Sequence, residues 1–193
     1  MTLRNDLQLI YDWIPEKSHV LDLGCGDGAL LSALTQSKQC TGYGIEINAN
    51  SVQAAIERGI NVIQADLEHG LTTFADQSFD IIVLSQTIQA MQNTETILRD
   101  LTRVAKQAIV TFPNFGYWRN RLQIALGGHM PVSERMPYQW YNTPNIHWCT
   151  LHDFDALCAK NNIRVLERAV MTAGKRIETL PNLMGSLAFY RVG

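Results

Sequence analysis

The chain has 193 residues, and 16 Lys and Arg against 18 Asp and Glu give a formal net charge of −2. Hydrophobic residues make up 46%, as in ordinary globular proteins, and no apolar run approaches the ~20 residues that span a bilayer. The near-neutral balance argues against a nucleic-acid-binding surface, because neutralising phosphates requires clustered Lys and Arg. Residues 1–6 also lack the features of a signal peptide. We therefore expect a cytoplasmic protein that handles small molecules or other proteins.

Apolar periodicity over the first 112 residues predicts alternating helices and strands. Helical spacing over residues 3–14 ends at Pro15, and a second apolar helix is expected over residues 29–34. Asn50-Ser51 is expected to cap a helix that runs to Arg58, and Thr94 to cap one that runs to residue 104. Apolar runs between these helices predict strands over residues 19–23, 41–47, 60–64, 79–84 and 108–112.

The amino-acid composition changes at residue 113. Residues 113–149 are rich in aromatic residues with interleaved arginines, and they predict a lid over one edge of the sheet, with Tyr117, Arg119 and Arg121 near a ligand. A structural cap and a protein-docking face are open alternatives, since Trp, Tyr and Arg dominate protein interfaces. The aromatic residues of this segment are Phe115, Tyr117, Trp118, Tyr138, Trp140, Tyr141 and Trp148.

Periodicity returns after the aromatic segment. A helix is expected over residues 151–161, then strands over residues 163–170 and 185–191, with a polar loop holding Lys175-Arg176 between them. Strands that alternate with helices are typical of βαβ units. We predict a single α/β domain over residues 1–193, with a mainly parallel seven-stranded sheet and a C-terminal antiparallel hairpin.

A glycine-rich turn follows the first predicted strand. Gly24, Gly26 and Ala29 fit the loose G-x-G-x-x-G/A pattern of proteins that bind nicotinamide, flavin or S-adenosylmethionine (SAM). Asp22 precedes this turn, Asp27 lies in it, and residues 20–37 contain no Lys or Arg. These carboxylates would repel a pyrophosphate but attract the ammonium and sulfonium of SAM. The charges therefore favour SAM over a nicotinamide dinucleotide.

Acidic residues also follow the next two predicted strands. Glu46 stands 20 residues beyond Gly26, at the position of an acid that accepts hydrogen bonds from ribose hydroxyls. Asp66 is a candidate acceptor for the adenine amino group, and Leu67 is a candidate packing surface for the ring. Because open parallel sheets bind ligands at their carboxyl edge, these positions support one another.

Residues 20–28, Val-Leu-Asp-Leu-Gly-Cys-Gly-Asp-Gly, resemble the SAM-binding signature of class I methyltransferases. More narrowly, residues 84–89, 111–119 and 140–147 resemble the methionine biosynthesis protein MetW family, although His129 stands where that family usually has Arg. The resemblance implies a Rossmann-like class I SAM methyltransferase fold and, for some members, association with homoserine O-acyltransferase. It implies SAM or S-adenosylhomocysteine as ligand, bound by Asp22, Gly24, Cys25, Gly26, Gly28, Glu46, Ile47, Asp66, Leu67 and Ser85.

The sequence carries no signature of a particular methyl acceptor. Ser85-Gln86-Thr87 stands where amino-DNA methyltransferases carry Asn/Asp-Pro-Pro-aromatic, and the four cysteines form no C-x-x-C pair. His147, Cys149 and His152 fit no common zinc spacing, so we expect no metal and weigh His147 as a base against a local hydrogen-bonding role. Two hypotheses follow: a SAM-binding partner that supports the acyltransferase, or a methyltransferase acting on a small molecule.

Overall fold

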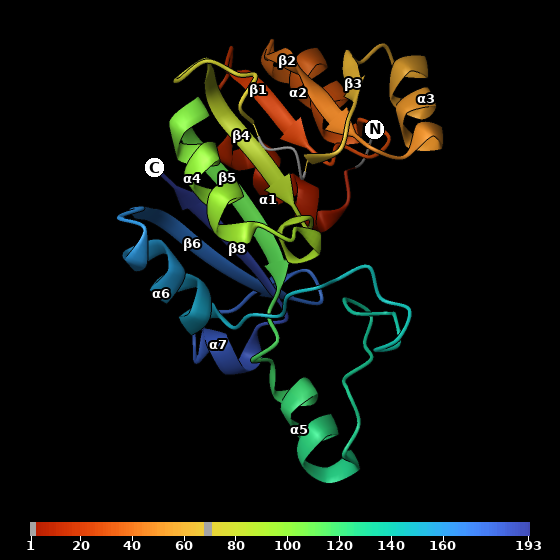
Figure 1. Ribbon diagram of the computed structural model, residues 1–193, viewed down its shortest axis with the longest axis vertical. Helices are drawn as coiled ribbons and strands as arrows, with labels where there is room; N and C mark the ends of the chain where they lie inside the picture. Colours follow the sequence, from red (N-terminus) through yellow and green to blue (C-terminus); the bar gives the residue numbers. More distant parts are fainter. Residues whose placement is uncertain (1–2, 68–70) are drawn as a thin grey trace.

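The computed structural model describes residues 3–67 and 71–193, so Met1 and Thr2 of the examined N-terminus lie outside the described residues. Figure 1 shows a twisted sheet with helices on both faces. The strands are β1 (His19–Leu23), β2 (Thr41–Glu46), β3 (Val62–Gln64), β4 (Phe79–Ser85), β5 (Ala105–Pro113), β6 (Val165–Thr172), β7 (Lys175–Arg176) and β8 (Leu187–Val192). In the described chain their order is β3-β2-β1-β4-β5-β8-β6-β7.

Parallel pairing on both sides of β1 brings three strand ends together. Leu23 lies opposite Ile45 of β2 and opposite Leu84 of β4. The residues that follow these three therefore meet at one carboxyl edge. Further along the sheet, β8 pairs antiparallel with both β5 and β6, which confirms the predicted α/β fold with its C-terminal antiparallel hairpin.

The helices cover the sheet in two layers, each over its own hydrophobic core. On one face α4 and α6 bury apolar residues such as Leu101 and Phe154, and on the other α1 and α2 bury Ile10 and Leu34. None of the described helices is long and apolar enough to cross a membrane. The helices are α1 (Asn5–Trp13), α2 (Ala29–Lys38), α3 (Ala49–Glu57), the 3-10 turn η2 (Ile88–Ala90), α4 (Thr94–Val104), α5 (Trp118–Gly127), α6 (Leu151–Lys160) and α7 (Pro181–Met184).

Several details differ from the sequence prediction. Thr94, predicted as a helix cap, is the first residue of α4, and Asn93 is the N-cap. The sheet has eight strands instead of seven, because Ala173 and Gly174 both take positive φ angles and turn the predicted polar loop into a two-residue hairpin. The cap of α3 is Asn48, whose side chain accepts hydrogen bonds from the backbone N–H groups of Asn50 and Ser51. The predicted Asn50-Ser51 cap is therefore wrong by two residues.

Residues 116–148 leave the sheet as a projection that begins and ends at one place. The amide of Phe115, just past β5, donates to the carbonyl of Cys149, just before α6, at 3.0 Å. The rings of Phe115 and Trp148 lie 5.8 Å apart at this base. Beyond it, α5 and the irregular chain that follows extend away from the sheet (Figure 1). The sequence did not predict α5.

Asn114 holds the base of this projection to the sheet. The residue is 1% exposed, and its Nδ2 donates to the carbonyls of Asn182 at 3.0 Å and Gly185 at 2.8 Å. Its Oδ1 accepts from the amide of Gly116 at 3.0 Å. One side chain thus joins the end of β5 to α7 and to the first turn of the projection.

Replacing Asn114 with Ala is expected to lower the free energy of unfolding by roughly 2–4 kcal/mol, because three buried backbone groups lose their partner. Urea denaturation measures this loss. Asn50→Ala, at an exposed position of α3, is the matched control and is expected to change stability by less than about 0.5 kcal/mol. Equal stability of the two variants would contradict the role assigned to Asn114.

Candidate functional site

The glycine-rich turn between β1 and α2 forms the floor of a cavity. The amides of Gly24 and Cys25 both donate to the carbonyl of Ile45, at 2.8 and 3.1 Å, which ties the turn to β2. A Cβ at Gly24 would lie 2.7 Å from Oγ1 of Thr87, whereas one at Gly26 would meet nothing within 4 Å. The turn is therefore packed at its first glycine and open at its second, where φ is +55°.

The cavity at this turn has a volume of about 470 Å³. Five of the ten predicted site residues line it, namely Asp22, Gly24, Cys25, Gly26 and Ser85. Asp27 and Ala29, which the sequence analysis also placed at this turn, line the cavity as well. The structure adds residues that the sequence analysis did not select, from α1 and its N-terminal flank and from the ends of α2 and α3, namely Leu3, Arg4, Leu7, Leu30 and Arg58.

Glu46 lies beside the turn, at the end of β2. One carboxylate oxygen accepts from the amide of Gly26 at 3.0 Å. The other accepts from the amides of Ile47 and Asn48, at 2.9 and 2.8 Å. Three backbone donors therefore fix the orientation of this carboxylate. A carboxylate has about four acceptor positions, so after these three bonds the remaining capacity for a ligand lies on Oε2, which accepts only from Gly26 among the bonds described.

Among the carboxyl groups of the site, that of Asp22 has the pKa that lies furthest from its ordinary value. The residue is 3% exposed, and burial, reinforced by the negative charge of Glu46, raises its pKa to about 7. The same causes act on the thiol of Cys25, whose pKa burial and the nearby Asp22 raise to about 12. Cys25 therefore stays protonated and is no nucleophile, whereas Asp22 is poised to become fully charged when a cation binds beside it.

Two arginines reach the cavity from distant parts of the chain. Nη2 of Arg58 lies 2.6 Å from Oδ2 of Asp27, so these two charges offset one another in the turn. Nε of Arg4 lies 3.4 Å from the buried carboxylate of Asp6. No local sequence pattern marks either arginine, because only the fold brings residue 58 to residue 27. Residues 20–37 contain no Lys or Arg, but the fold brings two arginines to the turn, so the positive charge near it is greater than the local sequence indicated.

Asp6 joins the cavity to the projection. Its side chain is 5% exposed, and its Oδ2 accepts from Nε2 of Gln86, at the end of β4, at 2.9 Å. Nη1 of Arg135, from the projection, lies 3.7 Å from the same oxygen. Because Arg4 and Ser85 both line the cavity, this junction lies directly beside it.

The other predicted site residues lie at or beyond the rim of the cavity. Gly28 precedes α2 with φ +72°, packed against Ala55 and Ile60, and Ile47 is 61% exposed at the end of β2. Asp66 is exposed, whereas Leu67 is buried in the core beneath α4. Of this last pair, only Asp66 is accessible to a ligand.

The predicted lid does not contribute to the described lining of this cavity, where no residue between 113 and 149 appears. Arg121 instead lines hollows beside α6 and α7. Tyr117 and Arg119 are likewise absent from the lining, so the structure does not bring the three residues to the glycine-rich turn.

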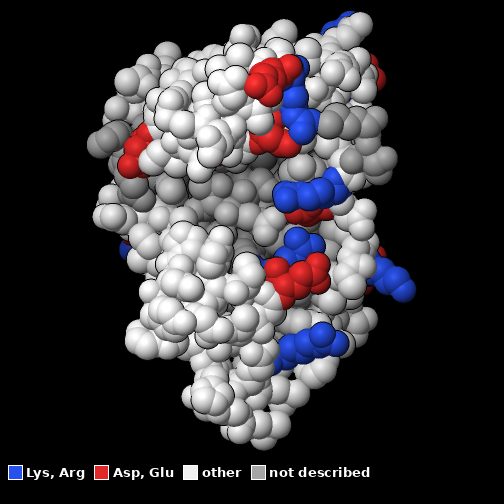
Figure 2. All heavy atoms as spheres, turned by 90° about the vertical axis from the view of Figure 1, so that its right-hand side faces the viewer, with Lys and Arg blue, Asp and Glu red and all other residues white. Residues whose placement is uncertain are grey.

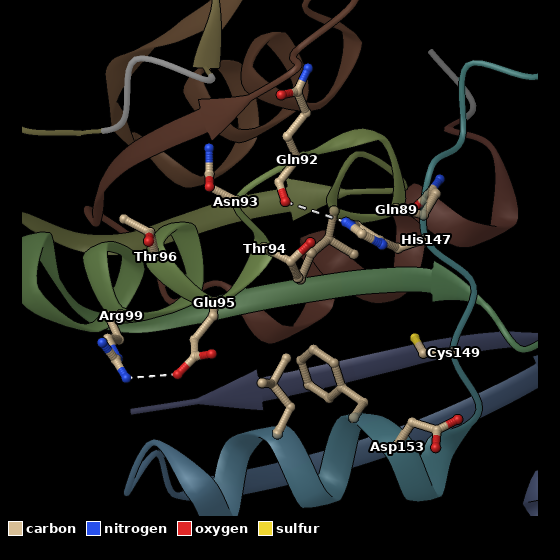
Figure 3. Close-up of a pocket in the computed structure, with 13 residues that line it drawn as sticks. Gln89, Gln92, Asn93, Thr94, Glu95, Thr96, Arg99, His147, Cys149 and Asp153 are labelled. Carbon is tan, nitrogen blue, oxygen red and sulfur yellow. Dashed lines mark hydrogen bonds and ion pairs between the residues drawn. The ribbon is translucent and has the colours of Figure 1, made fainter.

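A second cavity, of about 680 Å³, lies between η2, α4 and α6 (Figure 3). His147 and Cys149 line it. Nε2 of His147 lies 3.3 Å from the carbonyl oxygen of Gln92, a contact that fits the local hydrogen-bonding role considered for this histidine. His152 faces other hollows. Among residues 3–67 and 71–193, no group of three or more His, Cys, Asp or Glu is placed to hold a metal ion.

The family comparison covers almost the whole chain. The model of the family described as methionine biosynthesis protein MetW matches residues 4–192. A relative from Rhodopirellula baltica, the bifunctional methionine biosynthesis protein MetXA/MetW, is 36% identical over 207 residues. The match takes in 99% of this chain but 33% of the relative, so the chain spans about a third of that protein's length.

Solved structures agree with this chain in fold. An S-adenosylmethionine-dependent methyltransferase from Mesorhizobium loti has a TM-score of 0.72 at 14% identity, covering 98% of this chain and 97% of its own. A SAM-dependent methyltransferase from Thermotoga maritima, a possible histamine N-methyltransferase, has a TM-score of 0.69 at 18% identity, covering 97% and 86%. The chain thus has the Rossmann-like class I SAM methyltransferase fold, as predicted.

Asp22→Asn is expected to stabilise the ligand-free protein at high pH. The folded-state pKa of Asp22, about 7, lies well above the ordinary pKa of an Asp side chain, about 4, so the wild type loses stability as the pH rises from about 4 through 7. Asn imitates the protonated acid and escapes this loss. The difference in free energy of unfolding between variant and wild type should therefore grow by roughly 4 kcal/mol between pH 4 and pH 8.

Chemical denaturation across this pH range measures the difference. Asp12→Asn, at an exposed position of α1, is the control for replacing an Asp with Asn. A difference between Asp22→Asn and wild type that does not change with pH would contradict the raised pKa.

Proposed function

Because the chain belongs to the methionine biosynthesis protein MetW family, we propose that it is a SAM-binding partner that associates with homoserine O-acyltransferase and supports its activity. The proposal that the ligand is SAM rests on the buried carboxylate of Asp22 beside an open glycine-rich turn. The proposal of a protein partner rests on a relative in which the matched region is only a third of a bifunctional chain.

The charges around the turn favour SAM as the ligand. Arg58 pairs with Asp27, which leaves Asp22 and Glu46 as the acids that face a cationic ligand at the ends of β1 and β2. The ammonium group of SAM beside Asp22 would lower its pKa from about 7 and make it fully anionic. A doubly negative pyrophosphate would do the opposite and raise that pKa further. The raised pKa thus counts against a nicotinamide dinucleotide.

The remaining groups of SAM follow from the order of the strands. Glu46, oriented by three backbone donors, is our candidate acceptor for the two ribose hydroxyls. Asp66, exposed beyond β3, is our candidate for the adenine amino group, with Ile47 at the end of β2 beside the ring. S-adenosylhomocysteine presents the same three groups, so it is expected to occupy the same cavity.

The partner is proposed from the relative and from the family resemblance. The name of the Rhodopirellula baltica protein joins MetXA and MetW in one chain, of which two-thirds lies outside the match. Two units on one polypeptide meet at high effective concentration, which favours their association. We assign homoserine O-acyltransferase as the partner because the segments that resemble the MetW family imply it.

Glu46→Ala is expected to weaken SAM binding. The loss of two hydrogen bonds to a charged acceptor costs roughly 2–4 kcal/mol, which raises Kd about thirty-fold to a thousand-fold. Isothermal titration calorimetry measures Kd. A cooperative denaturation transition confirms that the variant is folded, with a midpoint that falls because three backbone amides lose their acceptor. Glu57→Ala, on the exposed surface of α3, is the matched control and should bind SAM as the wild type does. If Glu46→Ala binds SAM with wild-type affinity, the assignment of Glu46 to the ribose hydroxyls is wrong.

One equivalent of this chain is expected to increase the initial rate of homoserine acylation by the cognate acyltransferase. The increase should saturate near one equivalent, because association is stoichiometric. SAM, titrated into the same assay, will change the rate if it binds the free chain and the complex with different affinity. No rate change and no co-elution on a sizing column would overturn the partnership. A tritium-transfer screen for a small methyl acceptor would then test the methyltransferase hypothesis.

A further inference from the structure

The projection exposes apolar side chains that a monomer would ordinarily bury. Helix α5 has ten residues, and Asn120 is its only buried residue. Leu126 on this helix is 82% exposed, and Trp140 in the chain that follows is 73% exposed. The large apolar residues exposed over this projection are Leu122, Ile124, Leu126, Met130, Tyr138, Trp140, Tyr141 and Ile146.

A helix of this length draws little stability from its own hydrogen bonds. Isolated helices shorter than about 12–15 residues are marginal in water, and in proteins the burial of an apolar face stabilises them. In the described chain, α5 buries no apolar residue. A surface that covers Leu122 and Leu126, one helical turn apart, would supply the missing burial.

The projection carries few charges beyond the start of α5. Arg119 and Arg121 stand in the first turn of this helix, and between Leu122 and Ile146 the only Asp, Glu, Lys or Arg residues are Glu134 and Arg135. In Figure 2, which looks onto this side of the molecule, the charged side chains of the lower part lie right of its centre and the rest of that part is uncharged. Exposed apolar patches with few charges and with Trp and Tyr at their centre are typical of protein interfaces.

We propose that the exposed face of residues 118–146, with Leu126 and Trp140 as its main contacts, is the surface that docks homoserine O-acyltransferase; this proposal rests on the proposed function. The related chain from Rhodopirellula baltica supports this occupant, because two-thirds of that protein accompanies the matched region on one polypeptide. The partner must present an apolar, weakly charged surface. Arg135, in the same projection, links this face to Asp6 beside the cofactor cavity.

The test measures the affinity of the purified chain for the cognate acyltransferase by surface plasmon resonance. Leu126→Ser and Trp140→Ser are each expected to raise Kd at least about tenfold, as interface hot spots do. Ile56→Ser, at a 56%-exposed position of α3, is the matched control and should stay within about twofold of wild type. Affinity for SAM, measured in parallel, should be unchanged in all three variants, because none of these residues lines the cavity.

Hydrogen exchange tests the same surface without substitutions. Adding the acyltransferase to the wild-type chain should slow amide exchange within residues 118–146. Wild-type affinity in both projection variants, or protection confined to another region, would overturn the docking surface and leave the partnership intact. Failure of the wild type itself to bind would overturn the proposed function. A wild-type dimer that Leu126→Ser dissociates, seen by sedimentation, would assign the surface to a second copy and overturn this proposal.

Discussion

Parallel hydrogen-bonded pairing of β1 with β2 on one side and β4 on the other determines where the proposed ligand-binding residues lie. Because Leu23 stands level with Ile45 and Leu84, the next residues, Gly24, Glu46 and Ser85, lie together at the carboxyl edge of the sheet. A shift of one residue in either pairing would turn the side chains of the shifted strand to the opposite face of the sheet. The cavity is therefore a product of strand register.

The same register sets an electrostatic conflict that a ligand can relieve. It puts Asp22 and Glu46 at neighbouring strand ends, where burial and mutual repulsion penalise the charged form of Asp22. Glu46 is compensated by three backbone amides, and Asp27 by Arg58. The pKa of Asp22 is raised, and acids with perturbed pKa values are frequent at functional sites, where stability is given up for affinity. The acid with the most strongly raised pKa is thus the one best placed to meet a cation.

Local patterns were sufficient to predict the sheet and the turn but not what the fold brings together. The buried run before Gly24, the spacing to Glu46 and the carboxyl-edge rule are all properties of neighbouring residues, so the sequence predicted them. Arg58 was not predicted because its partner Asp27 is distant in sequence, and Arg4 was not predicted because only the fold brings it to the cavity. Helix α5 was not predicted because Ile124 lies off the face that Leu122 and Leu126 share, which weakens the periodicity that marks a packed helix. Leu67, predicted as a packing surface for adenine, is buried in the core, which the local sequence did not show.

The base of the projection has a consequence for how this surface can vary. Phe115 and Cys149 are hydrogen-bonded neighbours although 33 residues separate them, because 149 − 115 − 1 = 33. An insert whose two ends meet can change in length or sequence without pulling the flanking strand and helix apart. A change of length within residues 116–148 can therefore leave the strand ends beside the cavity in their positions. These 33 of 193 residues are in this sense a separable part of the chain.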